Sequence, residues 1–290
     1  MVEVTSPVVQ GEAVEVRPGR VLHVAHRRTN PEAPTLFFAH GGGGNKDQWR
    51  FIWQHPSLSE SNLVAWDLLG HGASPIPRDA SAYAWDELVA DQLAIFERYA
   101  GTQNILLAHS FGTALTLSAL VQLQERRQLE RVAAVLLLGT QLQSPRGRSP
   151  LFKLPAWILE LLRPVLAKGF REAAWHSQTD PALVAYEEKL TERNSLRVFK
   201  ALLGQTRWIP EAQLERLELP IRILAGESDR LTPPEGGRAL QARLPNAGFA
   251  ILERTAHQLM LERPDLVIEH LQVLLEDAAA TVHPAVIAQS

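Results

Sequence analysis

Six short, continuous apolar runs recur along this chain, and they constrain its fold more than any other feature. They are rich in β-branched and aromatic residues and comprise TLFFAH (35–40), NLVAWD (62–67), NILLAH (104–109), VAAVLLLG (132–139), IRILAG (221–226) and GFAILE (248–253). Runs of this kind are typical of parallel strands that are buried on both faces. Helical patterns separate them, for example over 83–100 and 111–128, so we predict a doubly wound α/β fold with a mostly parallel sheet.

Two further segments complete the predicted architecture. The segment 12–26 resembles a hairpin that turns at Pro18 and Gly19, and we expect it to form an antiparallel edge. The alternation of strands and helices stops between 141 and 210, where polar loops and helical stretches replace strands. We therefore predict an α/β core domain made of 1–140 and 211–290, with a helical cap (a lid) inserted over 141–210. The tail beyond about 278 has no strong pattern and is expected to be frayed.

Composition is that of a globular protein, expected to form one domain with an insertion, and it argues against a nucleic-acid partner. The chain has 290 residues, 46% of them hydrophobic, with 29 basic and 32 acidic residues and a net charge of −3. Because no run of Lys and Arg appears, nucleic acid is not expected as a partner. The absence of cysteine excludes disulfides and thiolate chemistry, and the acidic N-terminus is unlike a signal peptide, so we expect a cytoplasmic location.

The most apolar window, residues 151–170, does not match a membrane span. Four charged residues and two prolines interrupt it: Lys153, Glu160, Arg163, Lys168, Pro155 and Pro164. A spanning helix needs about 20 predominantly apolar residues. We therefore expect no integral membrane span and interpret the window as two short amphipathic helices. The oligomeric state is left open by the sequence.

The segment AHSFG (108–112) joins an expected strand directly to an expected helix. A nucleophile elbow has this strand, sharp turn and helix, with small residues two positions before and two after a central serine. Ala108 and Gly112 occupy those positions around Ser110. Since open α/β sheets bind ligands at the carboxyl ends of their strands, Ser110 also stands where a catalytic group is expected. We predict that Ser110 is a nucleophile.

A serine nucleophile needs a base, and the base needs an acid that orients it. In folds with a nucleophile elbow, the chain order is serine, then Asp or Glu, then His. Asp229 follows the strand predicted at 221–226, and His257 follows the last predicted strand, so both occur in this order. Glu227 lies close to Asp229 and leaves the exact acid open. Asp180 also lies between Ser110 and His257, but it belongs to the cap and is not favoured.

Four consecutive glycines, Gly41 to Gly44, follow the first apolar run. A P-loop would require Gly-Lys-Ser/Thr, and a dinucleotide fingerprint would require a third glycine where Lys46 stands. We therefore expect no phosphate cradle. Acyl transfer instead needs N–H donors aimed at the developing oxyanion, and we expect one from Phe111, the residue after the nucleophile, and one from this glycine loop.

Together, HGGGGN, DLLGHGAS, AHSFG, the loop around Asp229 and TAHQLMLERPD resemble the α/β-hydrolase fold superfamily over about residues 12–277. Within it, FERYAGTQNILLAHSFG and AHQLMLERPDLV are similar to subfamily eight of the α/β-hydrolase-domain-containing proteins. The resemblance implies a catalytic triad of Ser110, Asp229 and His257, with an oxyanion hole from Gly42 and Phe111. A serine in the elbow, where dehalogenases and epoxide hydrolases have an aspartate, argues against those two activities.

The remaining candidates concern the substrate. His109, next to the nucleophile, is expected to pack or to line a pocket, and Trp157 and Leu161 belong to an apolar face of the cap that could contact substrate. His40 and His71 are interpreted as turn-stabilising residues that bond to backbone. No metal-ligand spacing is present, so neither a metal nor another cofactor is expected.

The function that these patterns favour is a serine hydrolase of the esterase or lipase type, acting on a small-molecule ester or acyl substrate. Two alternatives remain open at this stage. Similar triads and glycine-rich loops also hydrolyse carbon–carbon bonds in diketones. A binding module on the same fold, with idle residues in place of a working triad, is the second alternative, and the intact order of the triad argues against it.

Overall fold

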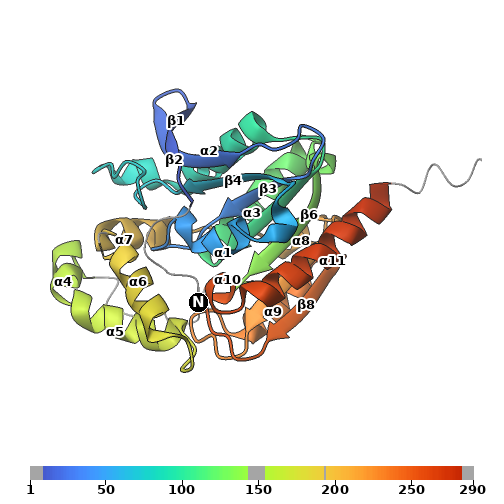
Figure 1. The fold of residues 1–290 in the computed structure, drawn as a ribbon. Helices are drawn as coiled ribbons and strands as arrows, with labels where there is room; N and C mark the ends of the chain where they lie inside the picture. The colour runs from blue at the N-terminus through green and yellow to red at the C-terminus, as the bar shows by residue number, and fades with distance from the viewer. Residues whose placement is uncertain (1–8, 143–153, 193, 283–290) are drawn as a thin grey trace, which may run out of the picture.

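A computed structural model describes residues 9–142, 154–192 and 194–282 of the chain, and its centre is an eight-stranded sheet (Figure 1). The strands are β1 (Glu12–Arg17), β2 (Arg20–Arg27), β3 (Thr35–Ala39), β4 (Asn62–Asp67), β5 (Asn104–His109), β6 (Val132–Leu138), β7 (Ile221–Gly226) and β8 (Ala247–Leu252). Their order in the sheet is β1-β2-β4-β3-β5-β6-β7-β8. All pairs from β4 to β8 are parallel. The predicted fold class is therefore confirmed.

The N-terminal hairpin forms the antiparallel edge of this sheet. Strand β1 pairs with β2, and β2 pairs with β4, both in antiparallel register. Gly19 has a φ of 72° in the connecting turn, a conformation that glycine adopts without the steric penalty of a side chain. The expected hairpin over 12–26 is confirmed, including its turn at Pro18 and Gly19.

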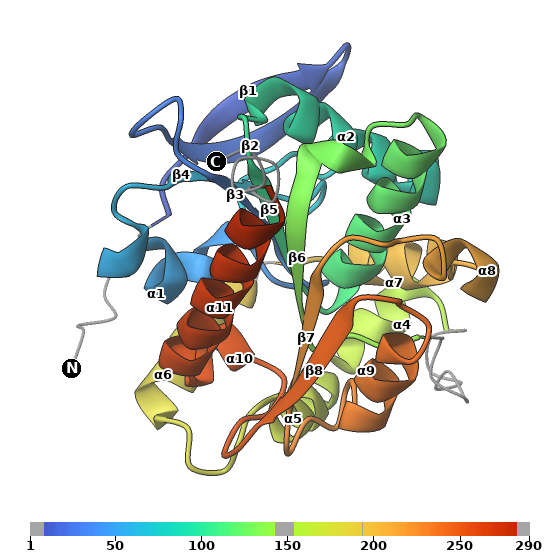
Figure 2. The same ribbon diagram turned by 90° about the vertical axis from the view of Figure 1, so that its right-hand side faces the viewer.

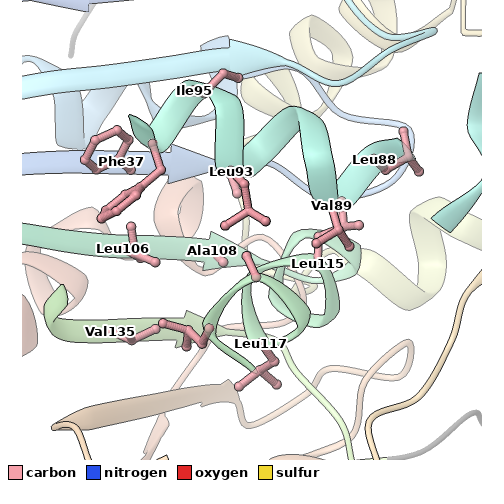
Figure 3. Close-up of a cluster of buried hydrophobic side chains, with 14 of the residues drawn as sticks. Phe37, Leu88, Val89, Leu93, Ile95, Leu106, Ala108, Leu115, Leu117 and Val135 are labelled. Carbon is pink, nitrogen blue, oxygen red and sulfur yellow. The ribbon is translucent and has the colours of Figure 1, made fainter. Parts of the chain in front are cut away.

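Helices cover both faces of the sheet, and each face has its own hydrophobic core (Figure 2). One face is covered by α2 (Trp85–Tyr99), α3 (Phe111–Glu125), α8 (Glu211–Leu214) and α9 (Pro234–Gln241). The other is covered by α1 (Arg50–Trp53), α10 (Leu259–Glu262) and α11 (Pro264–Val282). In Figure 3, Leu93 of α2 points toward β5 near Ala108, and Leu115 of α3 lies beside Val89 of α2 in the same buried cluster. This packing holds β5 and the start of α3, which flank Ser110, in a fixed place.

Within 141–210, where the sequence predicted a helical cap, the described residues form four helices. They are α4 (Ala156–Leu161), α5 (Arg163–Ala174), α6 (Pro181–Thr191) and α7 (Leu196–Gln205), and Figure 1 shows them gathered at one end of the sheet. The two short helices expected within 151–170 correspond to α4 and α5. The polar loop at 143–150, and Leu151 and Phe152, lie outside the described residues. The division into core and cap domains stays a prediction.

The C-terminal helix is longer than the sequence suggested. Helix α11 continues to Val282, so the expected loss of structure beyond about 278 was placed too early; residues 283–290 lie outside the described part of the chain. The apolar positions Val267, Ile268, Leu271, Leu274 and Ala278 are buried on one face of the helix, which explains its length. Within the described residues, no helix combines the length and the apolar character that crossing a membrane requires. The cytoplasmic location stays a prediction.

Candidate active site

Ser110 lies at the turn between β5 and α3 in the backbone conformation that an elbow requires. Its φ is 51° and its ψ is −119°, a conformation that costs a residue with a side chain roughly 1–3 kcal/mol. Its N–H donates to the carbonyl of Leu138 at 2.9 Å, and its carbonyl accepts from Thr113 Oγ1 at 2.6 Å. A β-carbon on Gly112 would lie 2.6 Å from the carbonyl oxygen of His40, so only glycine fits there.

Asp229 and His257 meet at the carboxyl ends of β7 and β8. Oδ2 of Asp229 lies 2.8 Å from Nδ1 of His257, and Oδ1 accepts from the backbone N–H groups of Leu231 and Thr232 at 2.8 and 2.9 Å. Burial disfavours the charged form of Asp229, but the nearby His257 and the hydrogen bonds from His257 and Thr232 outweigh it. The pKa of Asp229 therefore lies below its ordinary value, and the carboxylate is ionised.

The two alternative acids have other roles. Glu227 is exposed, and its Oε2 accepts from the backbone N–H of Arg254 at 3.1 Å. Asp180 caps α6, because its Oδ1 accepts from the N–H of Ala182 at 2.9 Å. Of the acids that the sequence left open, Asp229 is thus the one that contacts His257.

Sequence reasoning missed two residues that support this pair. The hydroxyl of Thr232 lies 2.6 Å from Oδ2 of Asp229 and 3.1 Å from Nδ1 of His257. Gly139, directly after β6, has a φ of 58°, and a β-carbon there would lie 3.2 Å from Nδ1 of His257. In the sequence, Thr232 stands three residues after Asp229, and Gly139 stands at the end of a buried strand. Neither position indicates that the residue contacts His257.

The end of β6 also brings Ser110 and His257 to the same place. Ser110 bonds to Leu138, the last residue of β6, and the ring of His257 packs against Gly139, the next residue. No hydrogen bond joins Ser110 to His257 among the described residues. Contacts of this kind often tighten only when substrate is bound, so the arrangement is compatible with a nucleophile and its base.

The glycine loop lies directly over the elbow. A β-carbon on Gly41 would be 3.0 Å from Cβ of Ser110, and one on Gly42 would be 3.4 Å from Cβ of Phe111. Phe111 is the first residue of α3, so its N–H has no acceptor within the helix. No described residue accepts a hydrogen bond from the N–H of Gly42. The two predicted oxyanion donors are therefore close neighbours, and their catalytic role stays a prediction.

Three buried histidines hold the backbone of the site. Nδ1 of His40 lies 2.7 Å from the carbonyl oxygen of Gly41, and Nε2 of His71 accepts from the N–H of Gly43 at 3.0 Å. The expectation that His40 and His71 bond to backbone is confirmed. Nε2 of His109 lies 2.8 Å from the carbonyl oxygen of His257, and the two rings are 4.7 Å apart. His109 thus packs behind the site, one of the two roles expected for it.

Two large apolar residues of α4 are exposed to solvent, whereas Leu159 of the same helix is buried. Trp157 is 66% exposed and Leu161 is 73% exposed, so little of either side chain is enclosed. Their contact with substrate stays a prediction. Phe199 of α7, within the predicted cap, lies against the glycine loop, since its ring is 3.6 Å from the position of a β-carbon on Gly42. No sequence pattern distinguished Phe199 from the other apolar residues of the cap.

Comparison with known proteins identifies the family of this chain. The model of the alpha/beta hydrolase family matches residues 36–270. The chain belongs to the alpha/beta hydrolase family. Members of this family occur among both its curated relatives and its structural neighbours, and the superfamily resemblance is confirmed.

Two relatives and one structure illustrate the similarity. Protein ABHD8 of Mus musculus is 29% identical over 260 residues, which cover 87% of this chain and 58% of the relative, so the chain spans less than two thirds of that protein. The resemblance to subfamily eight is thereby confirmed. The uncharacterized hydrolase YugF of Bacillus subtilis is 28% identical over 259 residues, covering 83% of this chain and 90% of YugF. A thermophilic esterase from Thermogutta terrifontis has the same fold, with a TM-score of 0.75 at 18% identity over 93% of this chain and 99% of that one.

Proposed function

We propose that this member of the alpha/beta hydrolase family is a serine hydrolase that cleaves carboxylic esters through an acyl-enzyme. The observation that carries the proposal is the strained conformation of Ser110 at its elbow, beside the hydrogen-bonded pair of Asp229 and His257. A strained serine is retained where the turn has to present its hydroxyl. The esterase named among the structural neighbours is consistent with an ester substrate.

The reaction follows from these positions. Oγ of Ser110 attacks the ester carbonyl carbon while Nε2 of His257 takes the hydroxyl proton. The ionised Asp229 keeps His257 in the tautomer with hydrogen on Nδ1 and stabilises the imidazolium that forms. The N–H groups of Gly42 and Phe111 donate hydrogen bonds to the carbonyl oxygen and stabilise the negative charge that develops on it. His257 then protonates the departing alcohol, and a water molecule, activated by His257 in the same way, hydrolyses the acyl group from Ser110.

The cap is assigned to substrate selection within this proposal. Phe199 lies against Gly42, one of the two proposed oxyanion donors, and the carbonyl of Ala174 in α5 accepts from the N–H of His257 at 3.0 Å. Two cap helices therefore contact the catalytic loops directly. Phe199→Ala should change the preference among acyl chains more than it changes the rate on an acetate ester. An equal fall in the hydrolysis rate for all acyl-chain lengths would indicate that Phe199 maintains the structure of the site and does not select the substrate.

A panel of p-nitrophenyl esters, from acetate to long-chain acyl groups, tests the proposed reaction. The wild-type protein should hydrolyse at least one ester, and Ser110→Ala should lose at least roughly a thousandfold of that rate. A folded Ser110→Ala protein that keeps substantial activity would contradict the proposal. Cleavage of a diketone with no hydrolysis of any ester would assign the same residues to carbon–carbon bond cleavage.

A further inference from the structure

The peptide unit between Gly43 and Gly44 is hydrogen-bonded at both ends. Its carbonyl, from Gly43, accepts from the side-chain amide Nδ2 of Asn194, a cap residue that lies two positions before the start of α7. Its N–H, from Gly44, donates to the carbonyl of Gly41 at 3.1 Å. The cap and the glycine loop are thus joined through a single peptide unit.

The peptide unit between Gly41 and Gly42 continues this chain of contacts. Its carbonyl accepts from Gly44 and also lies 2.7 Å from Nδ1 of His40. In a trans peptide the N–H points opposite to the carbonyl, so the N–H of Gly42 is directed away from both of these partners. The hydrogen bonds thus run from Asn194 through two peptide units and end at the N–H of Gly42. This N–H is the one that the proposed mechanism uses for the oxyanion.

Asn194 is itself held in place on the cap. Its backbone N–H donates to the carbonyl of Thr191 at 2.9 Å, and its carbonyl accepts from Nη2 of Arg163 at 2.9 Å. On the other side of Gly43, Nε2 of His71 accepts from its N–H at 3.0 Å. Gly43 also has a φ of 80°, which few other residues adopt. The loop is thus clamped between a core histidine and a cap amide.

We infer that Asn194 is a positioning residue for the oxyanion donor, because its amide orients two successive peptide units that end at the N–H of Gly42. Hydrogen bonds in series polarise one another, so the amide of Asn194 also strengthens the final donor. Catalysis then depends on a side chain of the cap, although that side chain does not touch the substrate. This inference rests on the proposed function.

The variant Asn194→Ala tests the inference. Outright loss of one oxyanion donor lowers kcat about a hundred- to a thousandfold, and because Gly42 keeps its N–H here, we expect a smaller fall of roughly tenfold with KM nearly unchanged. A trifluoromethyl ketone, which forms an oxyanion adduct with a nucleophilic serine, should lose affinity by a similar factor. Asn194→Asp removes the donor and sets a carboxylate against the carbonyl of Gly43, so its kcat should fall at least as far.

Asn246→Ala is the matched control. The Nδ2 atom of Asn246 also donates to a backbone carbonyl, that of Glu218, but it does so at an exposed position in the loop before β8. Both variants lose one bond of the same type, and thermal unfolding reports the loss of stability in each. Only Asn194→Ala should lower kcat. With ¹⁵N-labelled glycine, the amide resonances of Gly42 and Gly44 should shift in Asn194→Ala while that of Gly19 stays unchanged.

The outcomes separate the inference from the function on which it rests. If wild-type protein hydrolyses esters and a folded Asn194→Ala protein matches its kcat and its affinity for the ketone, the inference is overturned and the function stands. An equal fall in Asn246→Ala would also overturn it. If wild-type protein hydrolyses no ester, the proposed function fails and this inference fails with it.

Discussion

Oδ2 of Asp229 lies 2.8 Å from Nδ1 of His257, whereas Glu227, two residues earlier in the same loop, accepts from the backbone of Arg254. Both acids follow β7 and both precede the histidine in the chain. The difference between them comes from the turn that follows Asp229, in which two backbone N–H groups and the hydroxyl of Thr232 converge on its carboxylate. The turn thus directs one carboxylate inward and leaves the other in solvent.

Replacing Asp229 should therefore be far more damaging than replacing Glu227. Asp229→Asn keeps the shape of the side chain but removes the charge that sets the tautomer of His257, and kcat should fall by roughly ten-thousandfold. Glu227→Gln keeps a side chain that can still accept the bond from Arg254, so kcat should change little. Steady-state kinetics on the best ester measure both values. A small fall in kcat for Asp229→Asn, combined with a large fall for Glu227→Gln, would show that Asp229 is not the acid of the triad.

The strain at Ser110 gives a prediction about stability. With φ at 51°, Ser110→Gly relieves a steric conflict that Ser110→Ala keeps. The greater entropy of glycine in the unfolded chain offsets part of this gain. The net difference should still be a stabilisation of about 1 kcal/mol relative to Ser110→Ala. Both variants should be inactive toward esters. Urea unfolding checks the order, and a glycine variant less stable than the alanine variant would argue against strain at the elbow.

The buried side chain of His109 gives a prediction about how the free energy of unfolding depends on pH. Burial, followed by the electrostatic effect of the nearby His257, lowers the pKa of His109 to about 3. In the unfolded chain a histidine has a pKa of about 6.5, so between these two values the unfolded chain binds a proton that the folded chain does not. The free energy of unfolding therefore falls as the pH falls from about 6.5 toward 3.

His109→Gln isolates this effect, because glutamine can still donate to the carbonyl of His257 but does not titrate. Near pH 5, the free energy of unfolding of the wild-type protein should fall more steeply with acidification than that of the variant, by up to about 1.4 kcal/mol per pH unit. Urea titrations at several pH values give the two slopes. A general loss of stability in the variant lowers its free energy of unfolding equally at every pH and leaves the slope against pH unchanged. Equal slopes would mean that His109 takes up its proton in the folded state.

The parts of the site that could be predicted from the sequence are those with local signals. The strand ending at His109, the small residues around Ser110 and the helix beginning at Phe111 are contiguous, so the elbow was readable from a few positions. Asp229 was favoured because polar residues that follow buried strands gather at one edge of a parallel sheet. The hairpin turn at Gly19 was likewise local.

The unpredicted parts depend on contacts between distant segments. Asn194 bonds to a glycine 151 positions earlier, and nothing near either residue in the sequence identifies the other. Gly139 and Thr232 acquire their roles only when the ends of β6, β7 and β8 are set side by side. The end of α11 was missed for the same reason, since the helix is stabilised by burial against the sheet and not by a capping pattern.

Mass spectrometry of the intact protein after reaction with a fluorophosphonate is the most direct test of the central claim, that Ser110 is an activated nucleophile. We expect a single adduct that peptide mapping assigns to Ser110, slow labelling in His257→Ala, and none in Ser110→Ala. Ser228→Ala is the matched control, since Ser228 is an exposed serine in the loop of Asp229, and it should label at the wild-type rate. No adduct on the wild-type protein, or an adduct on a serine other than Ser110, would contradict the account.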